Sequence, residues 1–419
     1  MFSTYTLTTN ILRGVQQYSR LSLRNIGSIR NSVTSHNRNL FIKPQPKTNQ
    51  NSILHRFCSN GPKAEPVKSK KIVGYWLLGC SGMVFTAVVL GGVTRLTESG
   101  LSMVNWKLLG ERWPKTEDEW IAEFEKYKQY PEFKLKNPDI SLSDFKSIFF
   151  MEYAHRMWGR LIGGVFAVPA IYFWSRGYLS KQLKPRILIY GTLIGLQGLM
   201  GWYMVKSGLE NRFTEPNDVP RVSQYRLATH LSLAFILYVS MFWAALDTLI
   251  PAQKLATVAT KGALRFRQLA MVAKTLIFCT AVSGAFVAGL DAGLIYNSFP
   301  KMADKWIPSD IMALSPIPRN FTENPTTVQF DHRILGISTL SVVTAVWLMA
   351  RKHKLPPRAY YAATALGMMG WLQVALGIST LLTHVPVALA ACHQSGSLVL
   401  LSAAFWLTHE LKYLKYLPK

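Results

Sequence analysis

The first 64 residues contain no aspartate or glutamate, and the first acidic residue of the chain is Glu65. They also lack the apolar core of a secretory signal peptide, which excludes that kind of leader. The stretch is instead rich in Arg, Lys, Ser, Thr and Asn, as mitochondrial transit peptides are. We therefore expect residues 1–64 to be a transit peptide and disordered leader, cleaved near Phe57. An uncleaved basic tail is the alternative.

Cysteine and charge are also scarce in this chain. Only four cysteines are present and none has CxxC spacing, so neither a disulfide framework nor a cysteine metal site is indicated. Only 16% of the 419 residues are charged, whereas 49% are apolar. The net charge of +25 would suggest nucleic acid for a soluble protein, but here the basic residues lie in the leader and in short loops. We therefore expect a polytopic membrane protein that binds no nucleic acid.

Eight apolar runs follow the leader, and each has about the 20 residues that a helix needs to cross a bilayer. We expect membrane helices at residues 72–94, 149–174, 186–205, 227–250, 268–290, 329–350, 359–382 and 387–408. The short loops near 176–186, 254–267 and 351–358 are basic and contain no acid. The positive-inside rule therefore places these loops and both termini in the mitochondrial matrix, with the long loops in the intermembrane space.

The chain also repeats a pattern at a long interval. Residues 91–101 are echoed by residues 284–294, and four apolar runs belong to each copy. Because four is an even number, the two copies have the same orientation in the membrane, as parallel repeats do. The expected fold is an all-α polytopic membrane protein with two four-helix bundles, at 72–250 and 265–410, related by pseudo-two-fold symmetry.

Four of the nine histidines stand at matching places in the two halves: His155, His230, His332 and His393. Each lies near the start of a predicted helix, and the helices of a pair run in the same direction. Both histidines of a pair therefore lie at similar depth, toward the intermembrane space. Two imidazoles within one bundle can be the axial ligands of a haem iron. An ordinary buried histidine is the alternative at each position, and a zinc or copper site would need more ligands close together.

An acidic residue accompanies only the first of these pairs. Glu152 precedes His155 by one helical turn, whereas Gln329 stands at the equivalent place before His332. A carboxylate in an apolar pocket can move protons and an amide cannot, so the first site is expected to be reactive and the second an electron relay or structural site. The alternative for Glu152 is an interfacial residue stabilised by the helix dipole.

Two further pairs of polar residues recur in the halves. Arg156 and Arg333 directly follow the histidines of the second and sixth helices. They either bind haem propionates, which arginine recognises well, or extend to the membrane interface. Gln197 and Gln373 occupy equivalent places in the third and seventh helices, where we expect them to form interhelical hydrogen bonds.

Three segments, together with the four histidines, resemble the haem A synthase family in its mitochondrial form. They are GGVTRLTESGLSM at residues 91–103 with Trp106 behind it, EYAHR at 152–156 and DHR at 331–333. The resemblance covers about residues 72–410. It implies an inner-membrane oxidoreductase that converts a ring methyl of haem O to a formyl group by successive hydroxylation. The product, haem A, serves cytochrome c oxidase assembly.

The resemblance also implies roles for individual residues. His155 and His230 would hold the substrate porphyrin, His332 and His393 would hold a haem B cofactor, and Glu152 would take part in catalysis. Ferredoxin is the electron donor that the family suggests. Haem O synthase and cytochrome c oxidase assembly factors are further expected partners, in a surrounding of membrane lipid.

Two other functions stay open at this stage. One is a di-haem cytochrome b-like electron carrier that leaves its haems unchanged. The other is a haem-binding assembly or transport protein without chemistry. Reconstitution with haem O, a reductant and O2 separates them from an enzyme, because only the enzyme forms haem A.

Overall fold

The computed structural model describes residues 69–210, 219–253, 261–353 and 355–416. The expected transit peptide and its cleavage site near Phe57 lie outside these residues. The described residues form helices and connecting loops and no β-sheet, which agrees with the all-α prediction.

Eight helices of the described part are long and apolar enough to cross a bilayer, which confirms the predicted number. They are α3 (Lys71–Leu96), α6 (Leu142–Ser175), α7 (Leu183–Leu209), α8 (Gln224–Leu249), α9 (Lys261–Gly289), α11 (Pro325–Lys352), α12 (Pro357–Leu382) and α13 (Val387–Glu410). Their limits agree with the predicted runs to within a few residues, except at the starts of α6 and α9. Both helices begin about two turns before the apolar run does.

The early start of α6 has a local cause. The Ser141 side chain accepts a hydrogen bond from the backbone N–H of Asp144 and so caps the helix. The first turns of α6 then pack against α4 (Glu117–Lys128), a short helix that the hydropathy pattern does not reveal; α5 (Pro131–Leu135) follows it. Buried aromatic rings join these elements: Trp120, Phe124, Tyr127, Phe145 and Phe149. The N-terminal end of α6 therefore belongs to a small folded cap outside the apolar span.

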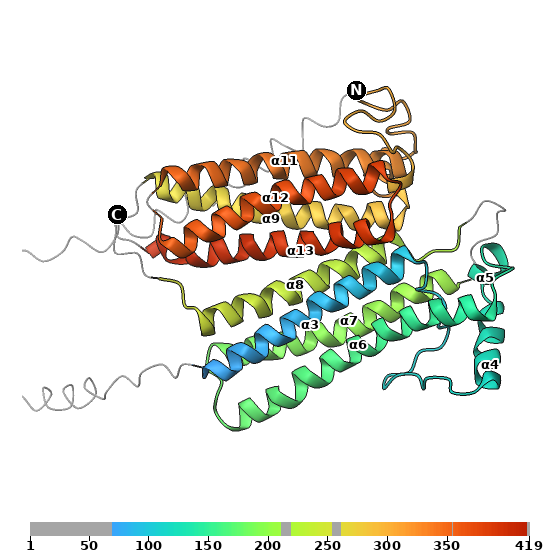
Figure 1. The fold of residues 1–419 in the computed structure, drawn as a ribbon. Coiled ribbons are helices and arrows are strands. Elements are labelled where there is room, and N and C mark those ends of the chain that lie inside the picture. The colour runs from blue at the N-terminus through green and yellow to red at the C-terminus, as the bar shows by residue number, and fades with distance from the viewer. Residues whose placement is uncertain (1–68, 211–218, 254–260, 354, 417–419) are drawn as a thin grey trace, which may run out of the picture. The chain divides into compact units, whose positions relative to one another are not determined.

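The same set of helix contacts occurs twice. In the first set, α3 packs on α6 and α8, and α7 lies between α6 and α8. In the second set, α9 packs on α11 and α13, and α12 lies between α11 and α13 (Figure 1). The two sets meet where α13 packs on α3 and α8 and where α8 packs on α9. The helices that carry the predicted histidines are therefore α6, α8, α11 and α13.

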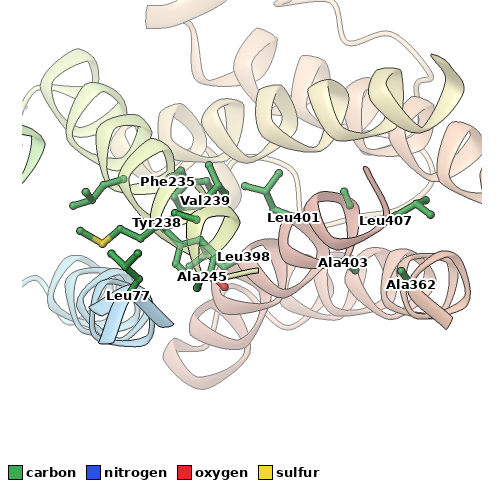
Figure 2. Packing of buried hydrophobic residues seen from close by; sticks show 14 of the residues in the cluster. Leu77, Phe235, Tyr238, Val239, Ala245, Ala362, Leu398, Leu401, Ala403 and Leu407 are labelled. Atoms are coloured by element: carbon green, nitrogen blue, oxygen red, sulfur yellow. The ribbon is translucent and has the colours of Figure 1, made fainter. Parts of the chain in front are cut away.

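Apolar side chains fill the region where the two sets meet. Leu77, Phe235, Leu398 and Leu401 are each at most 1% exposed, and Figure 2 shows them in one cluster. Because lipid is as apolar as these side chains, the contact between the two sets is stabilised by close van der Waals packing and not by removal of apolar surface from water.

Polar contacts join the two sets at one end of the helices. Asp291 accepts hydrogen bonds from Arg95 at 2.7 Å and from Arg221 at 3.3 Å. At the opposite end, Asp247 contacts the buried His409 at 3.0 Å. A partly buried ion pair is costly to break, because the remaining charge is left without a partner. The two sets are therefore linked by polar contacts at both ends and by apolar packing between them.

Candidate functional site

Each of the four predicted histidines lies with its ring against a glycine of the preceding membrane helix. In the first set, a Cβ placed on Gly91 of α3 would lie 2.9 Å from His155 Cε1. A Cβ placed on Gly201 of α7 would lie 3.3 Å from His230 Cε1. Both distances are shorter than ordinary carbon–carbon contacts, so the absence of a side chain is what makes room for each ring.

The second set repeats this contact. A Cβ on Gly284 of α9 would lie 3.2 Å from His332 Cε1, and one on Gly377 of α12 would lie 2.7 Å from His393 Cε1. Sequence analysis did not single out these glycines as part of the site. A signal was present, because Gly284 echoes Gly91 in the repeated segment, and Gly201 and Gly377 each lie four residues after the paired glutamines Gln197 and Gln373.

The rings of His332 and His393 lie close enough to share one iron. Their centroids are 6.4 Å apart and their planes are nearly perpendicular, at 87°. A metal–imidazole bond of about 2 Å on each side of an iron places two ring centres roughly 6 Å apart. The spacing of the second histidine pair would therefore allow both rings to hold one haem iron.

Hydrogen bonds hold both rings of the second pair. The Ser283 hydroxyl donates to the carbonyl of Thr280 at 2.7 Å, so at its 2.7 Å contact with His332 it accepts from Nδ1–H. His393 Nδ1 lies 3.1 Å from the carbonyl oxygen of Gln373, to which Nδ1–H can donate, and 3.2 Å from the Gln373 side-chain amide nitrogen. With the proton on Nδ1, each ring would leave its Nε2 lone pair free for a metal.

The first pair lacks such support. The Nδ1 atoms of His155 and His230 are buried and have no hydrogen-bond partner among the described residues. Metal-bound histidines almost always have a partner on the second nitrogen, which fixes the orientation of the ring. The rings of His155 and His230 are therefore held by packing alone, and less firmly than those of His332 and His393.

Glu152 is buried beside the first pair, with 2% of its surface exposed. Its Oε2 accepts hydrogen bonds from the Ser102 hydroxyl and from the backbone N–H of Met103, both at 2.7 Å. Its Oε1 accepts from Arg156 at 2.6 Å, one helical turn away. Arg156 also donates to the carbonyls of Met103 and Asn105. The carboxylate is therefore held in one orientation and anchors the loop after α3 to α6.

The second set has an uncharged version of this arrangement. Gln329 donates to the carbonyls of Ala292 at 2.8 Å and Tyr296 at 3.1 Å. Arg333 donates to Gln329 Oε1 at 3.2 Å and to the carbonyls of Tyr296 and Lys301. Both arginines thus bind backbone carbonyls of the loop that follows the first helix of their set, which sequence analysis did not predict. The i, i+4 spacing could have indicated their pairing with Glu152 and Gln329.

A second buried carboxyl lies near Glu152 in the extramembrane cap. Glu132 of α5 is 4% exposed. Burial, and next the charge of Glu152, raise the pKa of Glu132 to about 8. At neutral pH Glu132 is therefore mostly protonated.

The two glutamines at equivalent places in α7 and α12 form the interhelical hydrogen bonds that the sequence predicted. Gln197 of α7 donates to the main-chain carbonyl of His230 at 3.2 Å, and Gln373 of α12 donates to that of His393 at 2.7 Å. Each bond joins neighbouring helices at the level of a histidine.

Replacing Gly377 by alanine should displace His393, because the new Cβ would lie 2.7 Å from its Cε1. We expect weakened haem retention and a changed low-spin absorbance spectrum in the purified protein. Gly195→Ala in α7 is the matched control, since nothing lies within 4 Å of its added Cβ. Equal haem content and equal spectra in the two variants would contradict the placement of His393 against Gly377.

The chain is similar to known proteins over most of its length. A family profile described as "Cytochrome oxidase assembly protein" (COX15-CtaA) matches residues 74–405. Heme A synthase COX15 of Bos taurus is 56% identical over 345 residues, which cover 82% of this chain and 83% of the relative. The Arabidopsis thaliana protein of that name is 47% identical over 87% of this chain and 80% of its own. Heme A synthase of Nitrosospira multiformis is 46% identical over 82% of this chain and 94% of its own. The chain therefore belongs to the COX15-CtaA family of cytochrome oxidase assembly proteins.

Proposed function

We propose that this chain is a haem A synthase, which oxidises a ring methyl of haem O to a formyl group. The observation that carries the proposal is that two equivalent histidine pairs occur and only the first has a buried carboxylate beside it. The names of the relatives support the same activity. The product would be haem A for cytochrome c oxidase.

In this proposal His332 and His393 hold haem B, and His155 and His230 hold the substrate porphyrin. When bound, haem B supplies a redox centre for the oxidation. A resident cofactor needs ligands of fixed orientation, which the Nδ1 bonds of His332 and His393 provide. A substrate must enter and leave, and the less constrained rings of His155 and His230 suit that exchange.

Glu152 is the proposed catalytic residue. Ser102, the Met103 N–H and Arg156 orient its carboxylate. Its Oε2 receives two of these bonds and Oε1 one, so Oε1 keeps the capacity to accept a proton from the porphyrin edge. Arg156 and Arg333 are proposed to contact propionates as well as the loop carbonyls that they bind.

Hydroxylation by O2 consumes reducing equivalents, so the enzyme needs an electron donor. We propose ferredoxin in this role. Haem O synthase and cytochrome c oxidase assembly factors are the proposed protein partners. The two halves, at 72–250 and 265–410, are proposed to be parallel repeats, as the recurrent helix contacts and histidine–glycine contacts support.

The test is reconstitution of the purified protein in vesicles with haem O, a reductant and O2, followed by extraction of the pigments. We expect haem A to form. Recovery of two unchanged haem B groups, with added haem O unaltered, would instead identify a cytochrome b-like carrier.

We further propose a multi-pass protein of the mitochondrial inner membrane, with both termini in the matrix and the histidines toward the intermembrane space. Trypsin added to mitoplasts should then cut near Arg112 and Lys115, which are exposed in the loop before α4. It should spare residues 176–186 until detergent opens the membrane. Cleavage of that short basic loop in sealed mitoplasts would show that the protein has the opposite orientation in the membrane.

A further inference from the structure

The loop after α3 returns along the side of α6 (Figure 1). Arg160 of α6 donates from Nε to the carbonyl of Leu108 at 3.1 Å and from Nη2 to that of Lys107 at 2.5 Å. Its third nitrogen donates to the carbonyl of Arg156, which fixes the guanidinium against the helix. Residues 103–110 are thus fastened to α6 by arginine contacts to their carbonyls.

The contacts of Gly110 show how far along α6 this loop extends. A Cβ on Gly110 would lie 2.8 Å from Met157 Sδ and 3.4 Å from Arg160 Cδ. Gly110 also has φ of +105°, a conformation open to glycine and strained for other residues. Met157 lies two residues after His155, or about 3 Å further along the helix. The loop therefore reaches the level of the first histidine pair.

The tip of the loop is suited to lipid at Leu108 and Leu109, whereas the neighbouring Lys107 is 72% exposed and pairs with Glu111. Leu108 and Leu109 are 75% and 91% exposed, although they lie at the depth of residues inside the bundle. Exposed leucines are unfavourable in water and favourable against acyl chains. Backbone carbonyls at that depth need internal partners, and Arg160 supplies them for two residues of the loop.

The loop lies across the α6–α7 side of the first set. Its Trp106 ring contacts Trp202 of α7, with centroids 6.5 Å apart. Trp202 directly follows Gly201, which touches His230. In addition, α6 packs less closely against α7 than α11 does against α12. The loop therefore covers the looser helix contact of the first set, beside its histidine pair.

The second set lacks this fastening. Arg160 lies five residues after His155, and the residue five after His332 is Ile337. Ile337 is 50% exposed and makes no comparable bond to a loop. Only the half that is proposed to exchange its porphyrin therefore has an arginine at this position that binds the loop.

We propose that residues 103–110 form a lipid-facing gate between α6 and α7, through which a membrane-dissolved prenylated porphyrin reaches His155 and His230. This inference rests on the proposed function, because haem O carries the isoprenoid chain that keeps it in the bilayer. Arg160 is a positioning residue that holds the gate shut. Leu108 and Leu109 line the lipid side of the entrance, where the isoprenoid chain passes from the lipid acyl chains into the protein.

The first test measures exchange of bound haem O without turnover. Protein in phosphatidylcholine vesicles is loaded with haem O under nitrogen, and loss of the bound absorbance is followed after excess empty vesicles are added. Arg160→Ile, which introduces the residue of the second set, should speed exchange by at least about tenfold, because it removes both charged hydrogen bonds to the loop and one such bond is already worth about that factor. Arg160→Lys, which keeps the charge but loses the forked geometry, should give an intermediate rate. Haem B content should not change.

The second test leaves Arg160 intact. Trp106→Cys and Trp202→Cys, joined by a short bis-maleimide in a chain without other cysteines, should hold the gate closed. Joining the cysteines before loading should prevent haem O uptake, and joining them after loading should trap haem O in the site. A merely distorted site would lose haem O in both orders.

A third measurement tests whether residue 109 lies among the lipid acyl chains. A fluorophore on Leu109→Cys should be quenched by lipids with a spin label on the acyl chain, and one on the exposed Asp139→Cys should be quenched by aqueous iodide. The gate is refuted if position 109 is as open to iodide as position 139, or if neither Arg160→Ile nor the cross-link alters exchange. Haem A formation by the wild-type protein in the same vesicles is scored separately. Its absence would refute the proposed function, whatever the gate variants do.

Discussion

Glu152→Gln should lower haem A formation by about 10²–10⁴-fold, the usual scale for losing a positioned acid–base group. The glutamine cannot take up a proton, and it also loses the ion pair with Arg156. Folding should survive, because the swap is nearly isosteric and Gln329 occupies the equivalent place in the second set. Haem B should remain bound, and haem O or a hydroxylated intermediate should accumulate in the pigment extract.

Ser102→Ala is the matched control for this variant. It removes one hydrogen bond to Glu152 Oε2 but keeps the carboxylate, the Met103 N–H bond and the Arg156 ion pair. We expect a loss of no more than about tenfold, as for one hydrogen bond. If Glu152→Gln formed haem A at the wild-type rate while its thermal stability fell, Glu152 would anchor the loop after α3 and would have no catalytic role.

His332→Ala and His393→Ala should each remove an axial ligand and deplete the purified protein of haem B. Haem A formation should then be lost, whereas haem O should still be recovered from the His155–His230 site. Extraction and chromatography of the bound porphyrins measure both. Ser283→Ala removes only the partner of His332 Nδ1, and should weaken haem B binding by about 10–100-fold, as losses of such partners do.

His353→Ala serves as the control for loss of a histidine. His353 follows the end of α11 and packs against Phe266, away from both histidine pairs. The His353→Ala variant should retain a full complement of haem B. Full haem B content with unchanged spectra in both His332→Ala and His393→Ala would rule out this pair as the cofactor site.

Some of these features follow from residues that are near one another in the chain. Apolar runs long enough to cross a bilayer predicted eight helices, and eight are found. The histidines near the helix starts, the Glu152–Gln329 difference and the interhelical glutamines are likewise local patterns or their repetition. Hydropathy failed at the start of α6, because its first turns are stabilised by the Ser141 cap and by aromatic packing with α4.

Contacts between distant segments were decided by the tertiary structure alone. His332 and His393 have hydrogen-bond partners on Nδ1, whereas His155 and His230 have none among the described residues. This difference depends on which side chains the neighbouring helices bring to the level of each ring. The return of residues 103–110 to Arg160 spans a separation of about 50 residues, and no periodicity encodes it. Sequence by itself therefore determined the membrane helices and the candidate ligands, because helix length, hydropathy and charge act over a few turns. Which ligands are held firmly, and which side of the site a loop covers, depended on packing between elements far apart in the chain.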